Sequence, residues 1–401
     1  MKHVVISDQG AEYQRRGQAW MYASNLVRMD EDIENGEPVE ILTEAGEYLG
    51  TGLVSLNSHI LVRILSRDRS LPVDETLFRK RIREAYEFRR TAEPDNPDNC
   101  RLIFGEADLL PGFLADRYND VIVTQISSYG MEQRKDMLYR ILLEELAADH
   151  QVINAVYERN DVKIRQKEGL SLYKGFWNGV SHETKTVINE NGLKLNVDFE
   201  NGQKTGYFLD QKSNRLLIRR AARGKRVLDC FTHTGGFALN AAYGNAAHVT
   251  AVDVSETALQ QGRANARLNG LTNVEFVQAD VFDYLKTCTP GSFDLIILDP
   301  PAFTKSRRTV DHAYHGYQQI NLDAMNLLKE NHGYLATCSC SRYMETALFE
   351  QMLKETAAKA GVILKQVSVS QQNADHPVLW TMDETSYLKF YLFQAIQNCP
   401  G

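Results

Sequence analysis

The strongest constraint on the fold is a regular alternation of short apolar strands and helices after about residue 190. The segments RVLDCF (226–231), HVTAVDVS (248–255), NVEFVQAD, FDLIILDPP and GYLATCSCS predict five strands with helices between them. Units of this kind form right-handed βαβ crossovers and a parallel sheet with helices on both faces. SYLKFYLFQAI follows VILKQVSVS with no helix between them, which predicts an antiparallel pair. Residues 189–401 are therefore expected to form one α/β domain.

The residues before this domain show two other patterns. PVEILTEAGEYLGTGLVSLNSHILVRIL alternates apolar and polar residues around glycine-containing turns, which predicts a small β-barrel over residues 1–70. DETLFRKRIREAYEFRR has helical periodicity and is followed by the helix-breaking TAEPDNPDN (91–99). VIVTQI and INAVYER, on either side of a helical EQRKDMLYRILLEEL, then predict strands. Residues 71–188 are expected to form an α+β middle domain with a helical linker.

Composition narrows the class of protein. No apolar run approaches the roughly 20 residues that span a bilayer, and the first residues lack a secretory signal pattern. We therefore expect a cytoplasmic protein, not bound to membranes, whose six cysteines stay reduced. The formal net charge is −7, but the segment from Arg63 to Arg90 holds nine basic and five acidic residues. That segment is either an ion-paired helix face or a strip that contacts phosphates.

Carboxylates stand at the ends of successive predicted strands. They are Asp229, Asp253 and Asp280. Each alone could cap a helix, but ligands of open parallel sheets bind beyond these strand ends. The Gly235-Gly236 turn allows a ligand to approach the backbone, and Asp253 could bond the hydroxyls of a ribose. With Val281-Phe282 available to hold an adenine, the pattern favours a cofactor that contains adenosine.

The next two strand ends carry the reactive groups. LDPPAF fixes the backbone after Asp299, and TCSCS places Cys338 and Cys340 one residue apart, on the same face if the strand continues. If these strands are neighbours, Asp299 and both thiols face one site beside the cofactor. The cysteines could be buried small residues, a metal clip or a nucleophile. The metal interpretation is the weakest, because His332 and His376 are isolated in the sequence.

In this order, VLDCFTHTGGF, AVDVS, FVQADVF, LDPPAF and SCS resemble the class I S-adenosylmethionine (SAM)-dependent methyltransferases. GQKTGYFLDQKSNR (202–215) and ADHPV (374–378) are similar to segments of the RlmI-like 23S rRNA cytosine-C5 methyltransferases, and residues 1–70 look like a PUA domain. The resemblance covers nearly the whole chain. It implies a Rossmann-like domain with a seven-stranded sheet whose last strand is antiparallel, after a PUA β-barrel and an α+β middle domain.

This resemblance also implies functional residues. Cys340 would be the nucleophile and Asp299 would hold the target cytosine. The implied SAM-binding residues are Phe208, Asp210, Gln211, Asp229, Phe231, Thr234, Gly235, Gly236, Asp253, Asp280, Val281, Asp299 and Pro300. The implied partner is 23S rRNA, and a homodimer is compatible with the family. Two positions depart from the expected pattern, because Lys212 replaces an arginine and Cys338 is an additional thiol.

The implied chemistry is covalent. A thiolate adds to C6 of cytosine and makes C5 nucleophilic, and a base within folded RNA must first leave its stack. Two alternatives stay open from the residues alone. One is methylation of a base nitrogen, for example on guanine, which needs no cysteine. The other is an RNA-binding ribosome assembly factor that keeps a cofactor site without catalysis.

Overall fold

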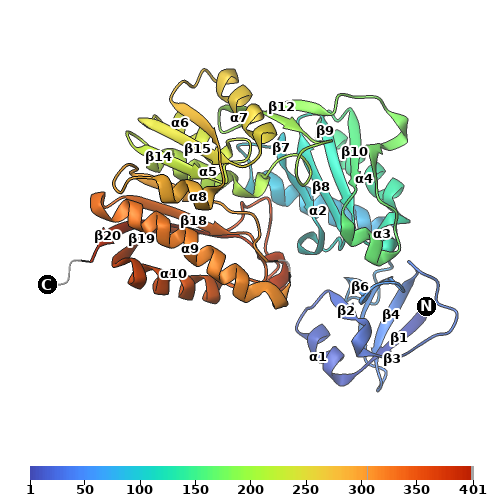
Figure 1. The fold of residues 1–401 in the computed structure, drawn as a ribbon. Coiled ribbons are helices and arrows are strands. Elements are labelled where there is room, and N and C mark those ends of the chain that lie inside the picture. Colours follow the sequence, from blue (N-terminus) through green and yellow to red (C-terminus); the bar gives the residue numbers. More distant parts are fainter. Residues whose placement is uncertain (305, 399–401) are drawn as a thin grey trace. The chain divides into compact units, whose positions relative to one another are not determined.

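The computed structural model describes residues 1–304 and 306–398. They form two compact units (Figure 1). The first comprises residues 1–188, 197–209 and 374–385, and the second comprises 189–196, 210–373 and the segment from 386 onward. A short hairpin of β12 (Lys185–Glu190) and β13 (Leu193–Asp198) carries the chain from one unit to the other. In the described ranges no helix has the length and apolarity that a membrane span requires.

The first unit begins with the expected β-barrel. Its six strands have the order β2-β6-β5-β4-β1-β3. They are β1 (Lys2–Ile6), β2 (Trp20–Tyr22), β3 (Leu26–Met29), β4 (Pro38–Thr43), β5 (Tyr48–Val54) and β6 (Ile60–Ser66). Val4, Ile41 and Val62 form part of a fully buried core. The helix α1 (Asp8–Arg15) was not predicted, because eight residues are too few to establish a periodicity.

The rest of the first unit is an α+β layer. Helices α2 (Glu75–Ala92) and α4 (Lys135–Ala148) share a core with a five-stranded sheet of order β11-β10-β9-β8-β7. The strands are β7 (Asn99–Phe104), β8 (Phe113–Tyr118), β9 (Val121–Ile126), β10 (Ala155–Asn160) and β11 (Tyr173–Phe176), and a short α3 (Tyr129–Glu132) precedes α4. Asp74 caps α2 by accepting from Thr76 N at 2.9 Å. The helix ends at Ala92, inside the predicted breaker.

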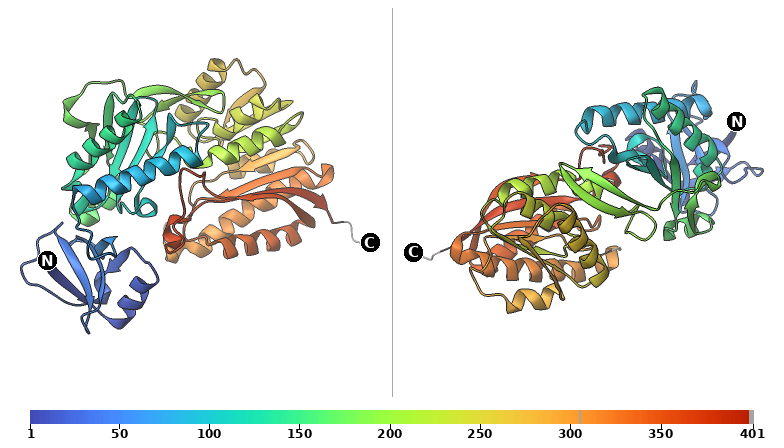
Figure 2. Two further views of the ribbon diagram at one scale, coloured as in Figure 1. Left: turned by 180° about the vertical axis from the view of Figure 1, so that it is seen from behind. Right: turned by 90° about the horizontal axis from the view of Figure 1, so that it is seen from above.

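The second unit contains a seven-stranded sheet of order β16-β15-β14-β17-β18-β20-β19 (Figures 1 and 2). Its strands are β14 (Arg226–Cys230), β15 (His248–Asp253), β16 (Val274–Gln278), β17 (Leu295–Leu298), β18 (Tyr334–Ser339), β19 (Val362–Ser370) and β20 (Lys389–Gln397). The first five are parallel, and β20 lies antiparallel between β18 and β19. The predicted antiparallel pair and the predicted adjacency of β17 and β18 are both confirmed.

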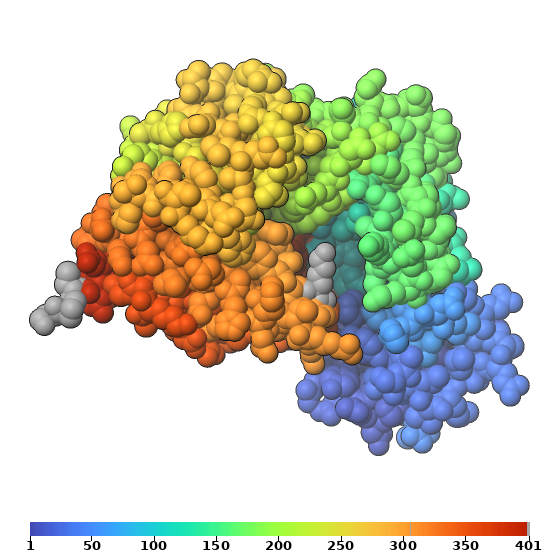
Figure 3. Space-filling model, in the orientation of Figure 1, coloured from blue at the N-terminus to red at the C-terminus, as the bar shows by residue number. Residues whose placement is uncertain are grey.

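Helices cover this sheet in two groups that pack among themselves. The first group is α5 (Lys212–Ala221), α6 (Gly236–Tyr243) and α7 (Glu256–Leu268), and the second is α8 (Val281–Thr287), α9 (Val310–Leu328) and α10 (Thr346–Ala360). Tyr317 of α9 and Phe349 of α10 pack with Leu228 and Leu298 of the sheet in one buried core. In the space-filling view, residues of the second group lie within the orange to red-orange part of the surface (Figure 3).

Strand order locates the functional edge. The chain moves outward from β14 to β15 and β16, then returns to place β17 on the other side of β14. Where the order reverses, loops leave neighbouring strands in opposite directions, and this switch point is where open α/β sheets bind ligands. The candidate ligand-binding site therefore lies at the carboxyl ends of β14, β17 and β18.

Candidate active site

Asp229 lies at the end of β14 and is completely buried. Its Oδ2 accepts from Thr232 Oγ1 at 2.5 Å and from Ala238 N at 2.9 Å, whereas its Oδ1 has no hydrogen-bond partner among the described atoms. Burial raises the pKa of this carboxyl to about 7, and the nearby Asp299 carboxylate adds to the shift. A buried carboxylate oxygen without a partner is costly, so it fits a cationic ligand group such as an amino acid ammonium.

The turn after Asp229 has a strained backbone. Phe231 and His233 adopt φ values of 62° and 51°, which non-glycine residues rarely do. Gly235, at φ 86°, begins α6, and a Cβ there would come within 3.1 Å of the Phe276 ring. The absence of a side chain at Gly235 and Gly236 leaves the backbone at the start of α6 accessible to a ligand, which fits the cofactor role predicted for Thr234, Gly235 and Gly236.

Asp253 and Asp280 mainly organise the backbone. Asp253 accepts from His233 N through Oδ2 and from Ser255 N through Oδ1, both at 2.9 Å. Asp280 caps α8 by accepting from Phe282 N at 2.8 Å, so the helix-cap interpretation holds for this residue. The adenosine contacts predicted for the two residues remain predictions.

Asp299 follows β17 and is held by two donors. Cys338 Sγ donates to Asp299 Oδ1 at 3.0 Å, and Gln211 Nε2 donates to the same oxygen at 3.2 Å. Gln211 is itself oriented by Asn214 Nδ2, which donates to Gln211 Oε1 at 2.7 Å. Ser370 Oγ then donates to Asn214 Oδ1 at 2.6 Å. This chain of hydrogen bonds was not predicted, because it joins segments more than 150 residues apart.

The two cysteines at the end of β18 differ in burial. Cys338 is fully buried, and burial together with the Asp299 carboxylate raises its pKa well above the ordinary value. Cys340 lies just beyond the last strand residue and is partly exposed. Ser341 Oγ donates to Thr304 O at 2.9 Å and Ser339 Oγ donates to Tyr317 OH at 2.9 Å, so both neighbours of Cys340 are fixed.

Lys389 was not singled out from the sequence. It is the first residue of β20, opposite Ser339 in the antiparallel register. Its Nζ donates to Ser341 O at 2.7 Å and to Tyr387 O at 2.9 Å, and only 8% of the residue is exposed. Burial lowers its pKa to about 8. A lysine that opens an apolar run, as in KFYLFQAI, is the one signal that could have identified it.

An aromatic cluster borders the same edge. The ring centroids of Phe231 and Phe303 are 6.3 Å apart, those of Phe282 and Phe303 6.1 Å, and those of Phe303 and Tyr317 4.7 Å. Val281, which precedes Phe282 in the sequence, and Pro300, three residues before Phe303, are both buried. Phe303 is thus part of a larger apolar surface, suited to a planar base or an adenine.

The predicted SAM-binding residues in the segment 202–215 are divided between the two units. Asp210 is buried in the second unit, where it accepts from Tyr387 OH at 2.6 Å. Lys212, the departure from the family pattern, is also buried there. Phe208 belongs to the first unit, where Lys204 Nζ lies 4.5 Å from its ring centroid. Its role as a cofactor contact stays a prediction.

The basic segment of the first unit is neutralised by carboxylates from other parts of that unit. Of the nine cations, six pair with acids outside the segment. These ion pairs are Arg63–Glu168, Arg69–Glu40, Arg79–Glu144, Arg83–Glu145, Arg89–Asp108 and Arg90–Asp149. The ion-paired interpretation is therefore favoured over a phosphate-contacting strip.

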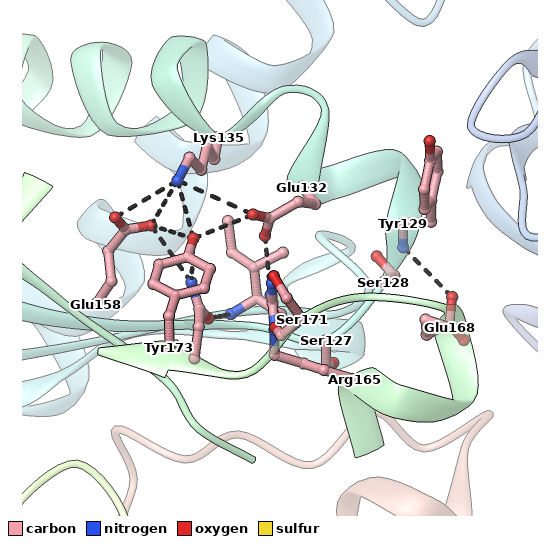
Figure 4. A network of polar contacts seen from close by, with 12 residues as sticks. Ser127, Ser128, Tyr129, Glu132, Lys135, Glu158, Arg165, Glu168, Ser171 and Tyr173 are labelled. Atoms are coloured by element: carbon pink, nitrogen blue, oxygen red, sulfur yellow. Dashed lines mark hydrogen bonds and ion pairs between the residues drawn. The ribbon is translucent and has the colours of Figure 1, made fainter. Parts of the chain in front are cut away.

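A second polar cluster lies around β10, β11 and α4 (Figure 4). Lys135 Nζ bonds Glu158 Oε1 at 3.1 Å and Tyr173 OH at 2.8 Å, while Arg165 Nη1 bonds Glu132 Oε2 at 2.8 Å. The two cations, Lys135 and Arg165, neutralise the two carboxylates, Glu158 and Glu132. We therefore interpret the cluster as stabilising the fold. Over the described ranges, no group of three or more potential ligands could hold a metal ion.

Comparison with known proteins agrees with this geometry. A family model for S-adenosylmethionine-dependent methyltransferases matches residues 121–394, and a model for a PUA-like domain matches residues 4–67. The cofactor of this chain is therefore SAM, and the unpartnered Asp229 oxygen and the glycine turn are compatible with it.

Two relatives have the same name. A Klebsiella pneumoniae ribosomal RNA large subunit methyltransferase I is 39% identical over 379 residues, covering 93% of each chain. An Escherichia coli protein of that name is 38% identical and covers 93% of this chain and 94% of its own.

Solved structures share the fold. A candidate SAM-dependent methyltransferase from Streptococcus mutans has a TM-score of 0.82 at 22% identity, covering 98% of this chain and 100% of its own. A candidate methyltransferase solved with SAH has a TM-score of 0.83 at 21% identity and the same coverage. From its site geometry, family models and curated relatives, the chain belongs to the SAM-dependent methyltransferase family that includes ribosomal RNA large subunit methyltransferase I.

Proposed function

We propose that this protein methylates C5 of a cytosine in 23S rRNA through a covalent adduct with Cys340. The carrying observation is the pair of groups at the ends of β17 and β18, where Asp299 is held by two donors and a partly exposed thiol lies two residues from Cys338. The curated relatives, which are named as methyltransferases of large-subunit ribosomal RNA, support the substrate class.

The cofactor is assigned to the turn between β14 and α6. Asp229 would accept from the ammonium of its methionine part, and Gly235 and Gly236 would allow its close approach to the backbone. Asp253 would face the ribose. Bound SAM supplies an electrophilic methyl group on a sulfonium.

The protein supplies the activation of the base. The Cys340 thiolate adds to C6, and electron density moves to C5, which becomes the nucleophilic carbon. Asp299 would hold the cytosine through N3 or its exocyclic amine. After C5 has been methylated, loss of the C5 proton to a base restores the double bond and expels the thiolate.

RNA is expected to bind partly through the PUA-like β-barrel. The target cytosine must leave its stack to reach Asp299 and Cys340, which costs a few kcal/mol in a duplex and less in a loop. Because most cations of the Arg63–Arg90 segment pair with carboxylates elsewhere in the same unit, we assign the segment no main role in phosphate binding.

The test is methyl transfer from labelled SAM to protein-free 23S rRNA, followed by complete digestion and separation of the nucleosides. Label in 5-methylcytidine supports the proposal. Label in a methylated guanosine, together with full activity of Cys340→Ala, would establish the base-nitrogen alternative. Absence of label with retained SAM and RNA binding would favour a non-catalytic assembly factor.

A further inference from the structure

Among the described residues, a buried lysine ammonium is held next to Cys340 by neutral acceptors only. Lys389 is anchored through Nζ to the carbonyl of Ser341, the residue that directly follows Cys340. Its second acceptor, Tyr387 O, is also a neutral carbonyl. In the described part of the chain, Lys389 forms no ion pair with a carboxylate.

A buried ammonium normally has an anionic partner, because desolvation of a charge is only partly compensated by neutral acceptors. The titratable groups that act electrostatically on Lys389 are Cys340, Cys338 and, more weakly, Glu345. Tyr317 on α9 also feels both thiols, and burial raises its pKa above the ordinary range, so it stays a neutral phenol.

Of the two thiols, only Cys340 suits the role of anion. Cys338 donates to the Asp299 carboxylate at 3.0 Å and to Leu298 O at 3.3 Å, so ionisation would place two negative charges in contact. Cys340 is partly exposed and lies one residue from the carbonyl that anchors the ammonium.

We propose that Lys389 is the positioning residue that stabilises the Cys340 thiolate and so prepares the nucleophile. The inference rests on the proposed function only in treating Cys340 as the nucleophile. The Cys340 thiol releases its proton to solvent, and the resulting thiolate and the Lys389 ammonium form a neutral pair. An adjacent cation commonly favours a cysteine thiolate in this way.

The test measures the thiolate directly, without RNA. The full chain with bound SAM is alkylated with iodoacetamide from pH 5 to 10, and mass spectrometry follows each cysteine. The thiolate displaces iodide, so the rate reports the ionised fraction. For Lys389→Met we expect Cys340 alkylation at pH 7 to slow roughly tenfold and its inflection to rise by about one pH unit.

Matched variants separate charge from structure. Lys389→Arg keeps the cation and should retain most of the wild-type profile, whereas Lys389→Gln keeps a donor without charge and should follow Lys389→Met. Lys365→Met removes an exposed lysine from the adjacent β19 and should change nothing. Cys288, which is half-buried, serves as the thiol standard within each sample.

The outcomes are distinct. If Lys389→Met or Lys389→Gln binds SAM normally and its Cys340 profile coincides with that of the wild type, the inference is wrong. A shifted profile combined with a fully active Cys340→Ala would instead retain the thiolate pair and overturn the proposed function.

Discussion

Cys338 and Cys340 are separated by one residue, yet the fold gives them opposite surroundings. Cys338 is buried against the Asp299 carboxylate, which keeps it a neutral donor. Cys340 is partly exposed, and the ammonium of Lys389 is anchored to the carbonyl of the next residue, Ser341. The difference comes from the two strands on either side of β18. The end of β17 places the Asp299 carboxylate against Cys338, and β20 places the Lys389 ammonium at the residue after Cys340.

The largest expected effect separates the two thiols directly. Cys340→Ala should lower methyl transfer by on the order of 1,000-fold or more, because no other group can add to C6. Cys338→Ala should retain activity within about tenfold. Single-turnover transfer to 23S rRNA measures both, with calorimetry of SAM binding as the control. Equal losses in the two variants would contradict the division of roles.

Removing the anion beside Cys338 should have the next largest effect. Asp299→Asn preserves the shape of the side chain but removes the charge that would hold the cytosine. We expect kcat to fall about 100-fold, as when a single transition-state hydrogen-bond partner is lost. Steady-state kinetics on the RNA measures it. A change confined to KM would show that Asp299 only assists binding.

The buried Asp229 carboxyl should also make the affinity for SAM depend on pH. The pKa of Asp229 is raised to about 7, so the carboxyl is protonated below pH 7 and loses its attraction for the cofactor's ammonium. Affinity should therefore rise with pH, by up to about tenfold between pH 6 and pH 8. Burial lowers the pKa of His233, which leaves its ring neutral near pH 7.

Calorimetry across this pH range checks the effect of Asp229. Asp229→Asn should bind SAM more weakly and with a flat pH profile. Asp294→Asn is the matched control, because this acid pairs with Arg226 and precedes β17 at the other end of the strand. A wild-type affinity that does not vary between pH 6 and pH 8 would exclude Asp229 as the ammonium partner.

The smallest effect concerns stability. Cys338→Ala removes a buried side chain and its bonds to Leu298 and Asp299, so it should cost about 1 kcal/mol of unfolding free energy. Cys340→Ala should cost less than about 0.5 kcal/mol, since that side chain is partly exposed. Thermal unfolding followed by circular dichroism measures both. A larger loss of unfolding free energy in Cys340→Ala than in Cys338→Ala would contradict the argument that burial distinguishes the two cysteines.

The sequence predicts the part of the site that lies on parallel strands. Because β17 and β18 are consecutive strands in the chain, we expected them to be neighbours with their carboxyl ends at the same edge. In the structure they pair in parallel, and Cys338 Sγ lies 3.0 Å from Asp299 Oδ1. The Asp229 turn was located by the same rule. These inferences need only strand alternation and chirality.

The remaining features depend on long-range pairing. Lys389 reaches the Ser341 carbonyl, next to Cys340, because β20 inserts antiparallel beside β18, and Gln211 reaches Asp299 across 88 residues of chain. No local pattern encodes either contact. The sequence of the basic segment likewise left an ion-paired face and a phosphate-contacting strip both open, and only the folded chain brings Glu168 and Asp108 to Arg63 and Arg89.

The central claim is a covalent bond between Cys340 and C6 of the target cytosine. It is tested by incubating the protein and SAM with 23S rRNA that contains 5-fluorocytidine, whose fluorine cannot leave as a proton does, so the adduct is trapped. We predict a denaturant-stable protein–RNA complex whose crosslinked peptide contains Cys340, and none with Cys340→Ala. A crosslink at Cys338, or methyl transfer to unmodified rRNA without any trapped complex, would contradict this account.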